Sequence, residues 1–129
     1  VFTVSFPKPS QLVVSSLTAS RREEDDSKPV LDEIPTVPAK GIDGKFLADS
    51  YFQFECKFTE NLGKFGEWEL VVGDIVAARV DKAMARKTGN GMDEGQLIYD
   101  NPLLGYLHPD RFSIIKESHV FPFPKKFKR

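Results

Sequence analysis

The sequence predicts a mainly β, antiparallel fold, because two strand patterns follow one another in residues 51–80. In the first, apolar and polar side chains alternate, and alternate residues of a strand face opposite sides of its sheet. The apolar set is Phe52, Phe54, Cys56 and Phe58. The second, residues 68–80, is apolar on both faces near its middle, which indicates a strand covered on both sides. Residues 61–64 supply turn chemistry, so we expect a long hairpin in a barrel or tightly packed sheet.

The segments before this hairpin predict one strand, one helix and a long irregular stretch. Residues 2–6 read as a short strand that ends at Pro7, and Ser10 is placed to cap a short helix over residues 11–18. Residues 19–45 combine mixed charge with three prolines. Such a stretch favours a surface excursion that lacks a core of its own.

The segments after the hairpin predict two short helices and a final strand. Residues 81–86 form a helical turn, which residues 88–91 break with two glycines. A second short helix is expected over residues 93–99, where acidic side chains suit the first turn. The last strand is expected over residues 111–115, and a basic, aromatic, proline-interrupted tail begins at Phe121.

Length and composition limit the class of protein. With 129 residues the chain has the size of one domain, which we expect to cover residues 1–129. A net charge of −1 argues against a nucleic-acid partner, and the absence of a long apolar run argues against a membrane-spanning segment. No secretory signal is visible, so the expected compartment is the cytoplasm. The single cysteine, Cys56, lies on the apolar face of its strand and is expected to be a buried, inert thiol.

The beginning of the chain is itself a signal. The sequence starts at Val1 without a methionine and enters the first strand at once. Because a domain rarely begins in mid-strand, we expect earlier strands to be missing. The alternative is a trimmed N-terminus with nothing structural lost.

Four segments of the chain carry recognisable motifs, namely residues 2–7, 54–57, 71–81 and 103–112. Phe54-Glu55-Cys56-Lys57 contains a Glu-Cys pair, and residues 71–81 run apolar-Gly-acidic-apolar-Val-Ala. In this order and spacing the four segments resemble the flavin reductase-like family of FMN-binding split barrels. Residues 2–7 resemble the strand and helix after the first hairpin of that barrel, residues 54–57 its leucine-Glu-Cys strand, residues 71–81 its core strand, and residues 103–112 its closing aromatic-His-x-x-Arg-aromatic run.

This resemblance implies an antiparallel split β-barrel with a few short helices, of which residues 1–129 would be the C-terminal two thirds. It implies a flavin-dependent oxidoreductase that transfers hydride from NADH or NADPH to FMN, in preference to FAD, and that forms homodimers. The flavin ring carries this chemistry, so neither a catalytic side chain nor a metal is required. The alternative is a split-barrel module that binds flavin or a partner without turnover. A nucleic-acid module that stacks bases on the aromatic tail is disfavoured by the overall charge.

The resemblance also singles out three residues near the end of the chain. His108 is a candidate contact to the edge of the flavin or nicotinamide, with an ordinary turn histidine as the alternative. Arg111 is a candidate partner for a phosphate or flavin carbonyl, with a surface ion pair to Asp110 or Glu117 as the alternative. Phe112 is a candidate packing surface for either ring, with core packing as the alternative.

A second candidate site follows the first helix. Ser20 and Arg21, together with Arg22, place a hydroxyl beside two guanidinium groups, a combination that suits a flavin phosphate. Acidic residues 23–26 compete for those charges, so a solvated mixed-charge loop is the alternative. The histidines lack companion ligands at metal spacing, so no metal site is expected. Without its first strands the chain would expose strand edges and bind flavin weakly.

Overall fold

A computed structural model of the chain describes residues 1–66, 68–85, 94–107, 110–119 and 121. The chain divides into two compact units, Val1–Ala85 and Arg86–Arg129, and each is described by itself. The single domain expected over residues 1–129 stays a prediction.

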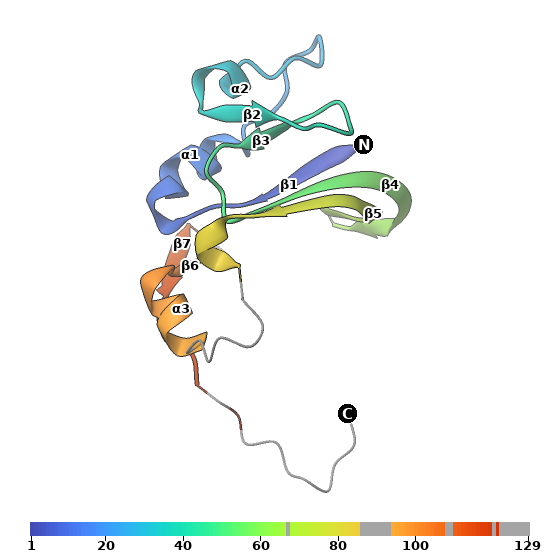
Figure 1. The fold of residues 1–129 in the computed structure, drawn as a ribbon. Coiled ribbons are helices and arrows are strands. Elements are labelled where there is room, and N and C mark those ends of the chain that lie inside the picture. Colours follow the sequence, from blue (N-terminus) through green and yellow to red (C-terminus); the bar gives the residue numbers. More distant parts are fainter. Residues whose placement is uncertain (67, 86–93, 108–109, 120, 122–129) are drawn as a thin grey trace, which may run out of the picture. The chain divides into compact units, whose positions relative to one another are not determined.

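The first unit is built on an antiparallel sheet with the strand order β1-β4-β5 (Figure 1). Its strands are β1 (Phe2–Phe6), β4 (Phe52–Phe65) and β5 (Trp68–Val80). β1 pairs with the start of β4, and β4 pairs with β5 along their whole length. The mainly β, antiparallel class, the first strand and the long hairpin are therefore confirmed.

The turn of the hairpin lies further along the chain than predicted. Residues 61–64 remain in β4, and the strands reverse between Phe65 and Trp68, which pair with each other. Gly63 has a φ of 126° at a register shift, and its amide donates to Asn61 Oδ1 over 2.9 Å. Only glycine adopts such a backbone readily, so the glycine that suggested the turn instead serves a bulge.

A register shift between Glu55 and Cys56 adds its extra residue, Val76, to β5, so β4 keeps its alternation as far as Phe58. Glu55 and Cys56 are both buried, and the prediction of a buried Cys56 is confirmed. Phe58 is 53% exposed, and it lies beyond Cys56, where the pairing of β4 with β1 ends. The predicted apolar face is therefore present, but Phe58 at its end is exposed.

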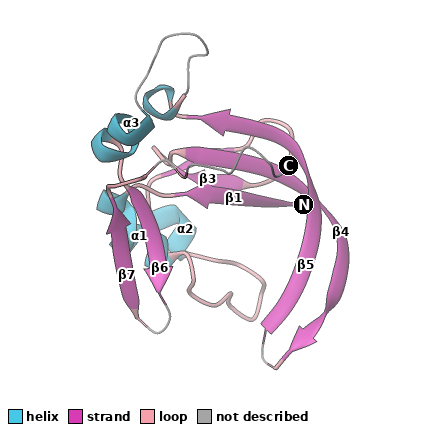
Figure 2. Ribbon diagram, turned by 90° about the horizontal axis from the view of Figure 1, so that it is seen from below, coloured by secondary structure: helices cyan, strands magenta, loops and turns pink. Residues whose placement is uncertain are grey.

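The expectation that β5 is covered on both sides is also wrong for this chain. β5 lies at the edge of its sheet, and its apolar side chains are exposed, with Trp68 at 72%. Figure 2 shows β4 and β5 curving away past the end of β1. The same figure and the pairing register leave this outer part of the hairpin as a two-stranded ribbon. The apolar pattern of residues 68–80 indicates that these side chains avoid water, but it does not indicate whether residues of the same chain cover them.

The helical segment after β1 begins earlier than predicted. A 3-10 turn, η1 (Pro9–Gln11), precedes the helix α1 (Leu12–Leu17), so Ser10 lies inside the turn and does not cap a helix. Proline favours the first helical position, because its φ is already fixed there and its missing N–H is not needed. The Gln11 side chain closes the turn instead, since its Oε1 accepts from Lys8 N over 2.9 Å.

Residues 19–45 are more ordered than predicted. They contain the short helix α2 (Val30–Glu33) and the strand β2 (Thr36–Pro38), which pairs with β3 (Lys45–Leu47). Ile34, Phe46 and Leu47 are buried, so this region and its strand partner have a core. The prediction of an irregular stretch is wrong where α2 and β2 form, but within residues 19–45 only Ile34 is buried, and the rest of this core comes from β3.

The remaining elements agree with most of the sequence-based expectations. The 3-10 helix η2 (Lys82–Met84) follows β5 and ends the first unit. In the second unit, α3 (Glu94–Asp100) confirms the predicted short helix, and β7 (Arg111–Ile115) confirms the last strand. β6 (Leu103–Leu107) was not predicted, and it pairs with β7 as an antiparallel hairpin. The predicted break at residues 88–91 and the tail after Phe121 lie outside the described residues.

None of the helices in the described part of the chain is long and apolar enough to cross a membrane.

Gly73 of β5 provides a test of this packing. A Cβ at position 73 would lie 2.7 Å from the Lys57 carbonyl oxygen and 2.8 Å from two ring carbons of Phe2. Since one of these neighbours is backbone, we expect Gly73→Ala to lower the free energy of unfolding by about 1–3 kcal/mol in urea titrations of the full-length protein. The control is Gly105→Ala, where the nearest atom is 3.8 Å away. Equal stability of Gly73→Ala and the wild type would contradict the placement of Phe2.

Candidate functional site

A groove of about 430 Å³ lies within the first unit. Its floor is apolar, because Phe46 is fully buried and Ile34 and Leu47 are buried beside it. Two hydroxyl groups of β1 line the groove and hold β3 in place. Thr3 Oγ1 donates to the Lys45 carbonyl over 2.7 Å, and Ser5 Oγ accepts from Leu47 N over 3.2 Å. The remaining walls come from α1, α2 and the segments around them; their lining residues include Ser15, Thr18, Arg22, Lys28, Leu31, Asp43 and Gly44.

Two cations and the end of α1 form one part of the groove lining. Lys28 Nζ donates to the Thr18 carbonyl over 2.6 Å. Arg22 Nη1 donates to the Asp26 carbonyl over 2.6 Å, and its Nε lies 3.5 Å from the Asp26 carboxylate. The Arg22 side chain remains 58% exposed, so its guanidinium keeps donors that face solvent. This part of the groove is suited to an anion.

Ser20 and Arg21, which were predicted to bind a phosphate, lie beside this cationic part and do not line the groove. Ser20 and Arg21 are exposed, and Ser20 N donates to the Leu17 carbonyl over 3.1 Å. Their neighbours Thr18 and Arg22 line the groove instead. Asp26, from the acidic segment 23–26, forms an ion pair with Arg22. This agrees with the alternative interpretation of the segment as a mixed-charge loop.

The other predicted site residues belong to the second unit. Arg111 and Phe112 are neighbours in β7, opposite Leu107 and Tyr106 of β6, so their side chains leave the hairpin on opposite faces. Phe112 is 48% exposed within the described residues. Arg111 forms no ion pair with Asp110 or Glu117 in the described part of the chain. His108 lies outside the described residues.

Sequence reasoning missed the most strongly bound polar residue of the first unit. Glu55 is 2% exposed, and its carboxylate accepts from Lys40 N over 2.9 Å, Gly41 N over 2.8 Å and Arg79 Nη2 over 3.0 Å. The Lys40 amide, followed by the Gly41 amide and the Arg79 charge, lowers the pKa of Glu55 against the opposing effect of burial. The alternating pattern placed Glu55 on a polar face. The Glu-Cys motif of the resemblance was the one signal that pointed to it.

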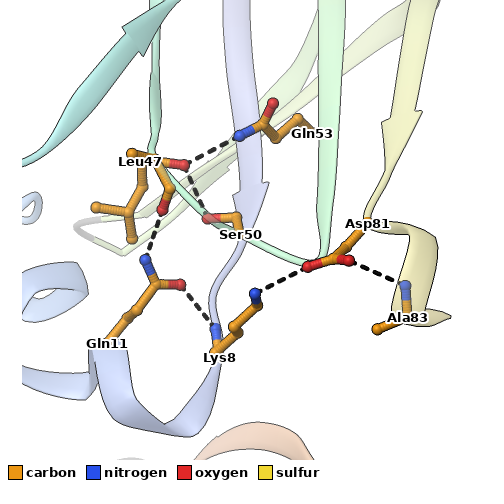
Figure 3. A network of polar contacts seen from close by, with 8 residues as sticks. Lys8, Gln11, Leu47, Ser50, Gln53, Asp81 and Ala83 are labelled. Carbon is orange, nitrogen blue, oxygen red and sulfur yellow. Dashed lines mark hydrogen bonds and ion pairs between the residues drawn. The ribbon is translucent and has the colours of Figure 1, made fainter. Parts of the chain in front are cut away.

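A network of polar side chains stabilises the end of the sheet where β1 ends and β4 begins (Figure 3). Lys8 Nζ lies 2.8 Å from Asp81 Oδ2 and 5.3 Å from the centre of the Tyr51 ring. Asp81 Oδ1 also accepts from Ala83 N over 3.0 Å and so caps η2. The hydrogen bond between the two side chains raises the pKa of Lys8 and lowers that of Asp81, while burial raises the pKa of Tyr51. Lys8 and Asp81 therefore stay charged at neutral pH, as an ion pair does.

Further hydrogen bonds extend this network to the neighbouring strands. Gln11 Nε2 donates to the Ala48 carbonyl over 2.6 Å, and both Ser50 Oγ and Gln53 Nε2 donate to the Leu47 carbonyl. Figure 3 shows these side chains converging from separate elements. The network is structural. The described residues contain no cluster of three His, Cys, Asp or Glu side chains that could hold a metal ion.

Comparison with known proteins gives a family and a fold. The model of the flavin reductase-like domain matches the chain over residues 1–107. The chain resembles a 2-nitrobenzoate 2-nitroreductase of Pseudomonas fluorescens with a TM-score of 0.68 and 18% identity, covering 98% of this chain and 61% of that one. It resembles component B of a nitrilotriacetate monooxygenase from Bacillus cereus with a TM-score of 0.66 and 14% identity, covering 92% and 58%.

A flavoredoxin of Desulfovibrio vulgaris is similar to the same degree, with a TM-score of 0.66, 16% identity and coverage of 95% and 63%. The chain thus spans 58% to 63% of the length of these three structures. No curated protein sequence matches the chain. The structural likeness gives the fold as that of the flavin reductase split barrels, and the described strands do not close the barrel.

Two substitutions of Asp81 separate the stabilisation by the cap on η2 from the stabilisation by the ion pair with Lys8. Asp81→Ala removes both, and we expect it to lower the free energy of unfolding by about 1–2 kcal/mol. Asp81→Ser retains an oxygen that can accept from Ala83 N, so it should lower the free energy of unfolding by less than about 1 kcal/mol. Urea unfolding of both variants measures the difference. Equal losses would show that the cap on η2 contributes nothing.

Glu55 predicts a dependence of stability on pH. Its pKa in the folded protein is lowered, so the unfolded chain takes up the proton first as the pH falls. The stabilisation by Glu55 is therefore complete above the ordinary glutamate pKa of about 4.3 and is lost as the pH falls through the folded pKa. Urea midpoints of the wild type and Glu55→Gln, measured from about pH 7 to about pH 3, should converge at the acid end. If the difference between the two urea midpoints stays constant over this pH range, protonation of Glu55 is not linked to stability.

Proposed function

The chain belongs to the flavin reductase-like domain family, and from this premise we propose that it acts as a flavin-dependent oxidoreductase. The reaction we propose is hydride transfer from NADH or NADPH to FMN. The bound flavin supplies the redox chemistry. The residues of this chain bind and orient it, and the compartment we propose is the cytoplasm.

The observation that carries this proposal is the groove of the first unit, with its apolar floor and cationic part. A volume of about 430 Å³ falls in the range of small-molecule sites. We propose that the phosphate of FMN lies against Arg22 and Lys28, with Ser20 and Arg21 next to them. FMN, which has one phosphate group, suits a groove with one cationic part better than FAD does. Phe2 and Leu31, half-buried apolar residues of the lining, would hold part of the isoalloxazine.

The second unit carries further candidate residues, which we propose independently of the groove. We keep Arg111 as a partner for a phosphate or a flavin carbonyl, because a guanidinium presents a rigid fork of donors. The exposed face of Phe112 offers a ring surface for the flavin or the nicotinamide. His108 remains a proposed contact on the basis of its sequence motif.

A homodimer is proposed as the functional form. The outer part of the β4–β5 hairpin exposes several large apolar side chains, among them Phe58, Phe65, Trp68 and Leu70. A two-stranded ribbon is marginally stable alone in water, and clustered exposed apolar side chains indicate an interaction surface. A second copy of the protein would cover them. Light scattering after size exclusion measures the state directly.

The first test is flavin binding and turnover by the full-length protein. We expect it to be purified with FMN or to bind added FMN, and to oxidise NADH or NADPH when FMN is present. Binding without turnover would favour the alternative of a non-catalytic flavin-binding module. A colourless protein that ignores added FMN would contradict the proposal.

The phosphate contacts can be tested separately. Replacing both Arg21 and Arg22 with alanine should weaken FMN binding about tenfold or more, because charge-assisted hydrogen bonds contribute about 1.5–3 kcal/mol each. Riboflavin lacks the phosphate, so its affinity should not change. The matched protein control is Lys57→Ala, an exposed cation on β4 outside the groove lining. Equal losses for FMN and riboflavin would show that the arginines do not contact the phosphate.

A further inference from the structure

The loop between β2 and β3, residues 39–44, forms one wall of the groove. Ala39 N donates to the Gly44 carbonyl over 2.9 Å and closes the loop on itself. Asp43 and Gly44 line the groove, and Lys45 and Phe46 continue the lining into β3. The shape of the groove on this side therefore depends on how the loop is held.

Glu55 holds this loop from a distance of about fifteen residues in the sequence. Its Oε1 accepts from Lys40 N, and its Oε2 accepts from Gly41 N, so each carboxylate oxygen binds one backbone amide of the loop. Glu55 with these two amides is called the Glu55 latch below. An ionised carboxylate has two acceptor oxygens and no donor, so it can offer a separate oxygen to each amide.

The β2–β3 loop packs closely against its neighbours at two glycines. A Cβ at Gly41 would lie 2.7 Å from Glu55 Oε2, so the carboxylate occupies the space that any other residue would need. On its other side the loop meets β1, where a Cβ at Gly44 would lie 2.9 Å from the Thr3 methyl group. These two contacts leave the loop little freedom to shift while Glu55 stays in place.

The latch also reaches the floor of the groove through Arg79. Arg79 Nη2 donates to Glu55 Oε1 over 3.0 Å, and its guanidinium carbon lies 5.3 Å from the centre of the Phe46 ring. Phe46 is the fully buried residue of the floor. One carboxylate thus positions both a wall of the groove and the cation that packs on its floor.

We propose that Glu55 is a positioning residue, which sets the β2–β3 loop in the conformation that the groove needs to bind its ligand. This inference rests on the proposed function for the identity of the ligand, but the state of the loop can be measured without any ligand. Glu55 lies on β4 outside the groove lining, so it acts through the loop and Phe46.

Amide hydrogen exchange of the full-length protein tests the latch. Glutamine at position 55 offers one acceptor oxygen and one donor, so Glu55→Gln leaves one of the two loop amides without an acceptor. We expect exchange at Lys40 or Gly41 to accelerate about tenfold or more, while amides paired between β4 and β5 keep their wild-type rates. The control is Glu60→Gln, the same change at an exposed position of the same strand. Equal acceleration at all amides would indicate loss of global stability and overturn the positioning role.

A second variant keeps the charge. Gly41→Ala pushes the carboxylate away through the 2.7 Å contact, and it should accelerate exchange at the amide of residue 40 or 41, as is expected of Glu55→Gln. Unchanged exchange in both variants overturns the latch, whatever the protein binds.

Titration with FMN then tests whether the latch serves the groove. We expect Glu55→Gln to weaken FMN binding at least about fivefold, with Glu60→Gln unchanged. Accelerated exchange beside an unchanged FMN affinity overturns the positioning role. If the wild type fails to bind FMN, the proposed function fails, and the exchange rates alone decide whether Glu55 holds the loop.

Discussion

The first unit depends on one buried carboxylate. Glu55 is almost completely enclosed, and three donors from a loop and from β5 satisfy its two oxygens. A buried charge that loses its partners is strongly destabilising, so the loop, β4 and Arg79 are constrained to move together. Because Arg79 also packs on Phe46, this constraint reaches the floor of the groove.

Three ionisable groups with shifted pKa values have structural roles. Glu55 and Asp81 are held in the charged form by their partners, as is Lys8, and each joins elements that are far apart in sequence. None of these groups is tuned towards neutral pH as a general acid or base would be. This pattern suits a protein in which a bound flavin carries the electrons and the chain supplies placement.

The expectations drawn from single strands were largely correct, and those that depended on register were not. The alternation in residues 51–80 predicted the hairpin, but three register shifts between β4 and β5 changed which residues face one another, and the turn lies after Phe65. A bulge adds one residue to one strand, and no local signal in the sequence marks it when the flanking residues still alternate. The groove was missed for a similar reason, since its lining comes from β1, α1, α2 and the β2–β3 hairpin.

The class of the fold and the family could be predicted from the amino-acid sequence, because side-chain alternation and short motifs are local properties of the chain. It also marked the cationic segment around Arg21 and Arg22. The folded structure was needed to show that Glu55 is buried, that Gly41 leaves room for its carboxylate, and that Arg22 rather than Arg21 lines the groove. These facts depend on contacts between residues far apart in the chain, and local spacing carries no record of such contacts.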